Sequence, residues 1–310
     1  MFTYTVRRIT ELIPVLIIVS VIVFSVMHLL PGDPTELMLA GAEGGAVSAE
    51  RLEELREVMG LNDPLYQQFG NFFVGAVQGD LGTSIRFRSP VTEIVLDRFP
   101  YTLRLSLAGL AVAMLIGVPL GTLAAIKRNT WLDSFSMALS LIGVSMPIFW
   151  LGLLLILVFA INLRWLPTTG AGGVKALIMP AFTLGFVSAA LVSRLIRSSL
   201  LEVLQEDYVR TARSKGLTGR AVLVHHAFKN ALIPVVTIIG LQFGHMLAGA
   251  VVTETVFSRP GLGRLVVNAI LWKDFPLVQG TVLFLAIMYV LVNLIVDISY
   301  AWLDPRIHYG

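Results

Sequence analysis

The hydrophobic positions of this chain form long apolar runs separated by shorter polar segments. A helix needs about 20 mostly apolar residues to cross the hydrocarbon core of a bilayer. Six stretches reach this length, near residues 9–30, 102–126, 132–160, 177–196, 232–257 and 277–303. The pattern therefore predicts an all-α, polytopic membrane protein with six transmembrane helices.

Proline and glycine modify this picture at particular positions. Pro147 lies inside the third stretch, where it removes a helical hydrogen bond, so we expect a kink there. Gly117 with Gly121, and Gly240 with Gly244, place small residues at a spacing of four, which lets helix backbones approach closely. We expect these faces to pack within the chain, and a dimer contact stays open as the alternative.

The segment 31–100 differs from the rest of the chain because it holds eleven of the twenty acidic residues and no spanning stretch. Within it, Ser48 to Met59 has the pattern of a short amphipathic helix. We interpret 31–100 as a small extracytoplasmic subdomain. It separates residues 1–30, a polar tip with helix 1, from a transmembrane core at 101–303 and a tail at 304–310.

Two features fix the expected orientation. The first apolar run is too long for the core of a typical signal peptide, so it is interpreted as a retained span. With the N terminus inside, the inner segments hold eleven basic residues in 55 positions and the outer segments hold ten in 106. Since Lys and Arg favour cytoplasmic loops, both termini are expected to be cytoplasmic.

Composition narrows the protein class further. Hydrophobic residues make up 56% of the chain and charged residues 14%, compared with about 25% charged in soluble domains. The mean hydropathy is +0.80. These values exclude a soluble globule and a disordered chain. The net charge of +3 does not indicate nucleic acid as a partner, and the absence of cysteine excludes disulfides, thiol catalysis and Cys-ligated metals.

Enzyme motifs are missing from the sequence. It contains no G-x-x-x-x-G-K-[ST] phosphate loop, no H-E-x-x-H and no G-x-S-x-G. We therefore predict a non-catalytic protein without a resident cofactor or metal site. A proton-coupled secondary transporter remains an alternative, with His245 near the middle of the fifth span as its only mid-membrane candidate. A membrane enzyme would need a catalytic constellation that the motifs do not supply.

The inner segment 197–231 is too long for a simple connector. Tyr208 and Ala212 fall at helical spacing after Leu201 and Leu204. Gly216 suits a helix stop, and Thr218 suits the N-cap of a second helix. A short basic amphipathic helix of this kind packs either on the membrane surface or against a soluble partner.

This inner segment carries a family resemblance. Arg210-Thr211-Ala212-x-x-x-Gly216-Leu217 resembles the signature loop of binding-protein-dependent ABC importer permeases, usually written EAA-x-x-x-G. Arg210 stands at the glutamate position and Thr211 at the first alanine, a departure that resembles the peptide/nickel importer branch. Four further stretches are similar to this branch: Pro-Gly-Asp-Pro (31–34), Gly-Asp-Leu-Gly (79–82), Pro-Gly-Leu-Gly (260–263) and Asp-Pro-Arg-Ile (304–307).

The resemblance implies a type I ABC importer permease fold in a bacterial-type inner membrane. It implies a coupling helix that binds to a separate ATPase subunit, and this subunit binds the ATP. The implied partners are a second, homologous permease, two ATPase subunits, an extracytoplasmic solute-binding protein and membrane lipid. The implied solute is a dipeptide, an oligopeptide or glutathione, with nickel or another small solute as the alternative. The residues assigned to ATPase coupling are Asp207, Tyr208, Arg210, Thr211, Ala212, Arg213, Lys215, Gly216 and Leu217.

Five further residues are hypothesised to line the translocation path or a gate. They are Ser145, Pro147, Gln242, His245 and Glu254. Ionisable residues within spans are costly to bury and by default point to function, with a structural role for Glu254 and a packing role for His245 as the alternatives. Residues 31–100 and 258–276 are expected to form the outer docking surface for the solute-binding protein.

Overall fold

The computed structural model describes residues 2–29, 53, 56–57, 62–170 and 172–303. The Pro-Gly-Asp-Pro stretch, most of the predicted helix at 48–59 and the tail at 304–310 lie outside the described residues. Every regular element within the described part is a helix, apart from one isolated bridge between Thr83 and Pro90. The all-α prediction is confirmed.

The described helices follow one another along the chain. They are α1 (Phe2–Leu29), α4 (Leu65–Val77), α5 (Val91–Ile126), α6 (Trp131–Ser145), α7 (Ile148–Leu155), the π-helical η1 (Ile156–Asn162), α8 (Lys175–Val203), α9 (Asp207–Ser214), α10 (Gly219–Ala221), the π-helical η2 (Val222–Ala227), α11 (Phe228–Val256), α12 (Leu262–Leu271) and α13 (Phe275–Leu303).

Each of the six predicted spans has a helical counterpart, in α1, α5, α6 with α7, α8, α11 and α13. Among the described residues, three stretches are long and apolar enough to cross a membrane by length and composition: α5, α8 and Phe275–Val296 of α13. The α6 and α7–η1 pair makes a fourth if it counts as one span. The apolar part of α1, Thr10–Val26, is shorter.

The second span begins earlier than the sequence indicated. We expected it near residue 102, yet α5 starts at Val91, so the last ten residues of the predicted 31–100 subdomain belong to this helix. Its first turns bury Val91 and Val95 against Leu262 and Leu277 of α12 and α13. This packing stabilises the helix through Pro100, which cannot donate a backbone hydrogen bond.

The expected kink at Pro147 is larger than a simple bend. The axes of α6 and the α7–η1 segment differ by 103°, and α6 ends as Met146 adopts an extended backbone before the proline. The residue before a proline avoids the helical region, which explains why the break falls here. The third span is therefore a broken helix.

Glycines let the central helices approach closely. A Cβ at Gly117 of α5 would lie 2.7 Å from the carbonyl oxygen of Ala189 on α8, and Gly121 faces Ser193 and Ile196 of the same helix. Gly240 and Gly244 of α11 face α13 in the same way. Both small-residue faces are therefore used inside the chain, as expected.

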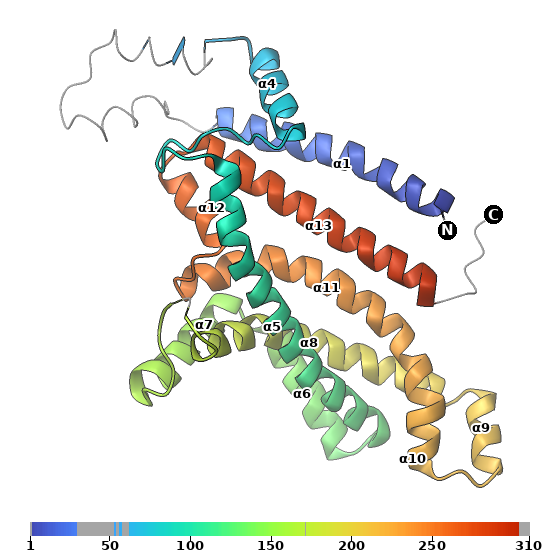
Figure 1. The fold of residues 1–310 in the computed structure, drawn as a ribbon. Coiled ribbons are helices and arrows are strands. Elements are labelled where there is room, and N and C mark those ends of the chain that lie inside the picture. Colours follow the sequence, from blue (N-terminus) through green and yellow to red (C-terminus); the bar gives the residue numbers. More distant parts are fainter. Residues whose placement is uncertain (1, 30–52, 54–55, 58–61, 171, 304–310) are drawn as a thin grey trace.

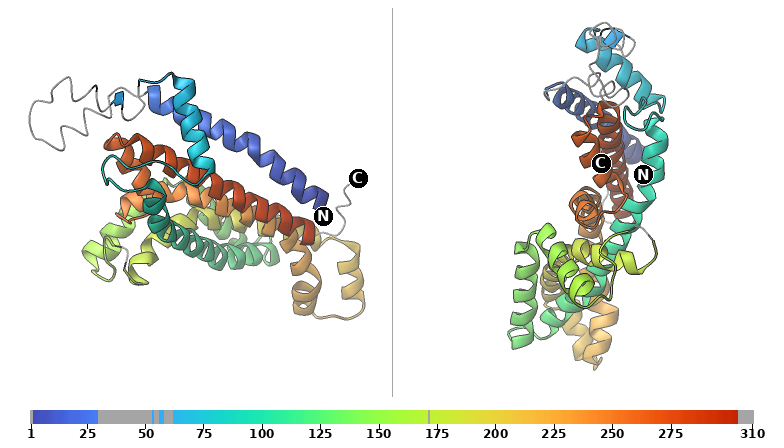
Figure 2. Two further views of the ribbon diagram at one scale, coloured as in Figure 1. Left: turned by 45° about the horizontal axis from the view of Figure 1, so that its top comes forward. Right: turned by 90° about the vertical axis from the view of Figure 1, so that its left-hand side faces the viewer.

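The helices run side by side along an elongated molecule with two distinct ends (Figure 1). One end carries the beginning of α1, the end of α13 and the projecting pair α9–α10, and Figure 2 shows the same grouping. The opposite end carries α7, α12 and the start of α5. The residues assigned to coupling lie at the first of these ends and Glu254 lies at the other.

Candidate functional site

The inner segment forms a short projecting helix, α9, which hangs beyond the ends of the long helices (Figure 1). Its inward face packs Val209 and Ala212 against Val222, with Leu204 beside them. Val209 is completely buried. This small apolar cluster holds α9 against η2, so α9 is fixed to the bundle rather than loosely tethered.

The outward face of α9 and the turn that follows it carry the remaining residues assigned to coupling. Tyr208 and Leu217 are each 41% exposed. The other exposed members are Asp207, Arg210, Thr211, Arg213, Lys215 and Gly216. Arg210 lies 3.7 Å from Asp207, and both side chains are largely in solvent. The exposed surface therefore offers two apolar anchors within a mainly basic face.

Ala212 departs from the expected arrangement. It was expected at the contact with a partner, but it is only 6% exposed and belongs to the internal cluster. Its smallness lets α9 approach η2 rather than an outside surface. Val209 was missed, although its spacing of three from Ala212 is the helical signal that could have revealed it.

The turn after α9 has the predicted form. Gly216 has φ +80°, a left-handed conformation that favours glycine, and Leu217 N–H donates to the Ala212 carbonyl at 3.3 Å. Thr218 is the N-cap of α10, and its Oγ1 accepts a hydrogen bond from Ala221 N–H at 3.4 Å. These two residues set the direction in which the chain returns to the bundle.

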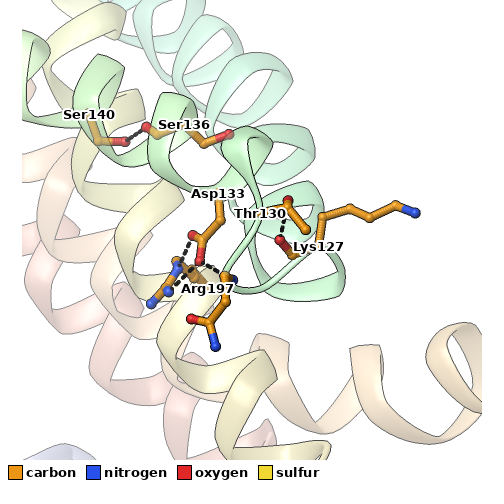
Figure 3. A network of polar contacts seen from close by, with 7 residues as sticks. Lys127, Thr130, Asp133, Ser136, Ser140 and Arg197 are labelled. Atoms are coloured by element: carbon orange, nitrogen blue, oxygen red, sulfur yellow. Dashed lines mark hydrogen bonds and ion pairs between the residues drawn. The ribbon is translucent and has the colours of Figure 1, made fainter.

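An ion pair joins two helices close to the projecting segment. Arg197 of α8 donates from Nε and Nη2 to the two carboxylate oxygens of Asp133 on α6, at 2.6 and 2.8 Å, and Figure 3 shows this paired geometry. Asn129 N–H donates to Asp133 Oδ2 at 3.0 Å. The Asp133 side chain is 7% exposed and that of Arg197 26%. A two-point arginine–carboxylate contact fixes both distance and orientation.

Sequence reasoning did not single out this pair. Arg197 was counted only as a basic residue at the start of the inner segment. Asp133 lies inside the predicted span 132–160, so its cost of burial was a signal that could have marked it. Its position as a first-turn acid of α6 also favours it there, because the helix N terminus attracts negative charge.

Glu254 lies at the opposite end of the molecule, in the last turn of α11, and is completely buried. Its Oε2 accepts hydrogen bonds from the backbone N–H groups of Gly263 and Arg264 at 2.8 and 3.2 Å. Its Oε1 accepts one from Thr102 Oγ1 at 2.6 Å. Gly263 and Arg264 are in the first turn of α12, so Glu254 caps this helix from a distance.

Thr102 and Arg259 complete this cluster. Thr102 Oγ1 accepts a hydrogen bond from Leu262 N–H at 2.8 Å, which links α5 to α12. Arg259 Nη1 donates to the carbonyl oxygens of Gly170 and Ala176 at 3.3 and 3.1 Å. Burial lowers the pKa of the Arg259 guanidinium, whereas the nearby Glu254 carboxylate acts in the opposite direction. The geometry makes Glu254 a structural tie between three helices.

The other path candidates are dispersed. Gln242 of α11 donates from Nε2 to Ser188 Oγ of α8 at 3.2 Å, and the His245 ring lies 6.2 Å from that of Tyr289 on α13. Ser145 and Pro147 flank the break between α6 and α7. Within the described part of the chain, no hydrogen bond joins any two of the five candidates, so their role in a path stays a prediction.

Two family models cover almost the whole chain. Residues 117–309 match the family described as "Binding-protein-dependent transport system inner membrane component". Residues 1–107 match "Binding-prot-dependent transport system membrane comp, N-term".

Curated relatives are similar over their full length. The glutathione transport system permease protein GsiC of Escherichia coli (strain K12) is 45% identical over 309 residues, covering 100% of both chains. The protein of the same name from Shigella dysenteriae serotype 1 gives the same values.

Solved structures share the fold at low sequence identity. A chain of the MetNI methionine ABC transporter in inward-facing conformations has a TM-score of 0.60 and 17% identity, covering 68% of this chain and 96% of that one. A chain of an amino acid ABC transporter solved with histidines has a TM-score of 0.52 and 15% identity, covering 70% and 95%. The predicted type I permease fold is confirmed, and the chain belongs to the family of inner membrane components of binding-protein-dependent transport systems.

Proposed function

We propose that this chain is the permease subunit of an ATP-driven importer that moves a small peptide-like solute, a dipeptide, an oligopeptide or glutathione, into the cytoplasm. The observation that carries this proposal is the 45% identity to glutathione permeases over the entire chain. The chain itself performs no covalent chemistry in this role. It lines part of the solute path and converts the movement of a partner ATPase into a change of the bundle.

The outward face of α9 is the proposed contact with the ATPase. Tyr208 and Leu217 are exposed large side chains in an otherwise polar segment, and a partner groove would remove them from water. Burial of two such side chains stabilises a complex by roughly 2–5 kcal/mol. A differential contact of this size shifts a two-state equilibrium substantially. Arg210, Arg213 and Lys215 would set the register against acidic groups of the partner.

The ion pair between Asp133 and Arg197 supports transmission of that movement. α8 leads directly into the α9 segment, and the two-point contact joins it to α6. A displacement of α9 would therefore reach α6 through α8. The broken span that follows α6 provides a place where the bundle can change shape.

The proposed assembly has a second, homologous permease, two ATPase subunits and a solute-binding protein. Both termini and α9 would face the cytoplasm, as the distribution of basic residues indicates. The outer docking surface would include residues 31–100 and 258–276. Nickel or another small solute is the alternative cargo, and a proton-coupled carrier is the alternative class.

Co-purification and uptake test the proposal together. We expect the chain to retain an ATPase subunit in detergent, and we expect proteoliposomes to accumulate peptide only with internal ATP and external solute-binding protein. A proton gradient alone should drive no uptake. Uptake that follows the proton gradient and ignores ATP would overturn the proposal.

A matched pair of variants tests the role of α9. Gly216→Asp forces a side chain onto a residue with φ +80°, which is strained by about 1–2 kcal/mol and reorients Leu217. Gly219→Asp adds the same group at a nearby helical position with open space around it. We expect Gly216→Asp to hydrolyse ATP without transport, and Gly219→Asp to retain transport. Equal transport by both variants would contradict the assignment of the α9 segment to ATPase coupling.

A further inference from the structure

A cavity with mixed apolar and polar lining lies between α1, α4 and the beginning of α13, away from the sites described above. Its volume is about 280 Å³, near the lower limit of small-molecule sites. Three aromatic side chains from these helices, Phe24, Phe72 and Phe275, form part of its wall. The rings of Phe24 and Phe72 are stacked with centroids 6.5 Å apart. The cavity is therefore built by packed elements rather than by one loop.

Gln279 is the side chain that marks this cavity as more than a packing gap. It lines the cavity from α13 and is only 8% exposed. Its side-chain amide makes no hydrogen bond to the described residues. The amide is not sealed in the core but opens onto the cavity, so a group inside the cavity can form hydrogen bonds with it.

The rest of the polar lining adds amides and one carboxylate. Asn71 of α4 and Gln68 one turn earlier present amides, and Asp80 presents a carboxylate from the loop after α4. Asp80 Oδ1 accepts a hydrogen bond from Gly82 N–H at 2.9 Å. Oδ2 makes no hydrogen bond to the described residues. His28 also lines the cavity, and no lysine or arginine among the described residues does so.

Two of these side chains are held in place by their own contacts. Gln68 donates from Nε2 to the Asp63 carbonyl oxygen at 2.8 Å, so its Oε1 is turned toward His28 Nε2, 3.1 Å away. His28 Nδ1 lies 2.8 Å from the Phe24 carbonyl oxygen, which fixes the orientation of the ring. The His28 ring and the Gln68 amide are therefore held in fixed orientations at one side of the cavity.

From this lining we infer that the cavity binds the amino end of a small peptide-like solute, with the ammonium group at Asp80 and the peptide amide at Gln279 and Asn71. An amide side chain can donate and accept at once, which matches the peptide group. A carboxylate favours an ammonium as its hydrogen-bond donor. The aromatic wall suits an apolar side chain of the solute. This inference rests on the proposed function and assigns this chain a solute site of its own.

Calorimetric titration of the assembled transporter, without its solute-binding protein, tests the inference. The probes are the dipeptide Ala-Leu and its N-acetyl derivative, which lacks the ammonium group. We expect saturable binding of Ala-Leu and at least tenfold weaker binding of the acetylated form, because a charge-assisted hydrogen bond is lost. Absence of saturable Ala-Leu binding at millimolar concentration, or equal affinity for both probes, would overturn the inference.

Two variants locate the binding. Asp80→Asn removes the charge but leaves an oxygen for Gly82 N–H, and Gln279→Leu removes an amide that has no partner in the described part of the chain. Each is expected to weaken Ala-Leu binding about tenfold without lowering thermal stability. Gln67→Leu is the matched control, because Gln67 is exposed on α4 and does not line the cavity.

The outcomes separate this inference from the proposed function. If both cavity variants bind Ala-Leu as the unmodified protein does, the site is wrong even when ATP-driven uptake persists. If no peptide is taken up by the complete system with its binding protein, the proposed function fails instead. A misfolded Gln279→Leu variant would leave the decision to Asp80→Asn, whose backbone contacts are preserved.

Discussion

Substitution of Glu254 distinguishes a helix tie from a gate residue. Its carboxylate accepts hydrogen bonds from Thr102 Oγ1 and from the N–H groups of Gly263 and Arg264, and the residue is completely buried. Glu254→Ala leaves three donors without an acceptor and opens a void. Since each unsatisfied buried donor costs about 1–3 kcal/mol and the partly exposed Arg264 can find water, we expect a loss of about 3–5 kcal/mol.

Glu254→Gln keeps the shape of the side chain but provides one acceptor oxygen in place of two. Either the contact to Thr102 or the contact to the α12 backbone is lost, so we expect a loss of about 1–3 kcal/mol. Thr102→Val should cost a similar amount, because it removes the donor to Glu254 and the acceptor for Leu262 N–H. The double variant should be less destabilised than the sum, since both changes break the same network.

Thermal unfolding of the purified assembly in detergent, measured beside peptide uptake, checks this ranking. Thr255→Val is the control, because Thr255 is exposed and its hydroxyl donates to the Val251 carbonyl within its own helix. It should change stability by no more than about 0.5 kcal/mol. If Glu254→Ala unfolds like the unmodified protein but abolishes uptake, the reasoning is refuted and Glu254 is a path residue.

Two further variants probe the packing of α8. Arg197→Ala leaves the buried Asp133 carboxylate unpaired and should destabilise the bundle by about 2–3 kcal/mol, a value reduced because Arg197 is partly exposed. Thermal unfolding in detergent measures this loss, and a variant in which Asp133 and Arg197 are exchanged should recover part of it. Gly117→Val places a side chain against the Ala189 carbonyl and Val192, so α5 and α8 must separate at a cost of at least about 2 kcal/mol. Normal thermal stability of Gly117→Val would contradict the close contact.

The sequence predicted those parts of the fold that depend on hydrophobic length and on local turn chemistry. Apolar runs marked a helix for each predicted span, and Gly216 and Thr218 act as helix stop and N-cap because their conformations are set by near neighbours. The beginning of α5 was missed because Pro100 and nearby charges argue locally against a helix. Only contact with α12 and α13 reveals why the helix persists there.

The roles of the candidate site residues were harder to predict because they depend on contacts with residues far away in the sequence. Glu254 was noticed as an ionisable residue within a span, but its three donors lie on α5 and α12, so its capping role was invisible in the sequence. Ala212 was assigned to a partner contact because it belongs to the signature loop. Its inward position follows from Val222, ten residues further on, which no local pattern joins to it.

The glycine contacts between α5 and α8 restrict where the molecule can deform. Gly117 and Gly121 bring the α5 backbone against carbonyl oxygens of α8 and against the stiff β-branched side chains of Val192 and Ile196, which leaves little freedom for sliding. α5 and α8 must then move together as one rigid unit. A change between conformational states of the bundle must therefore occur at other helix contacts. The helix break at Pro147 and the contacts of α1 are the places that this arrangement leaves able to move.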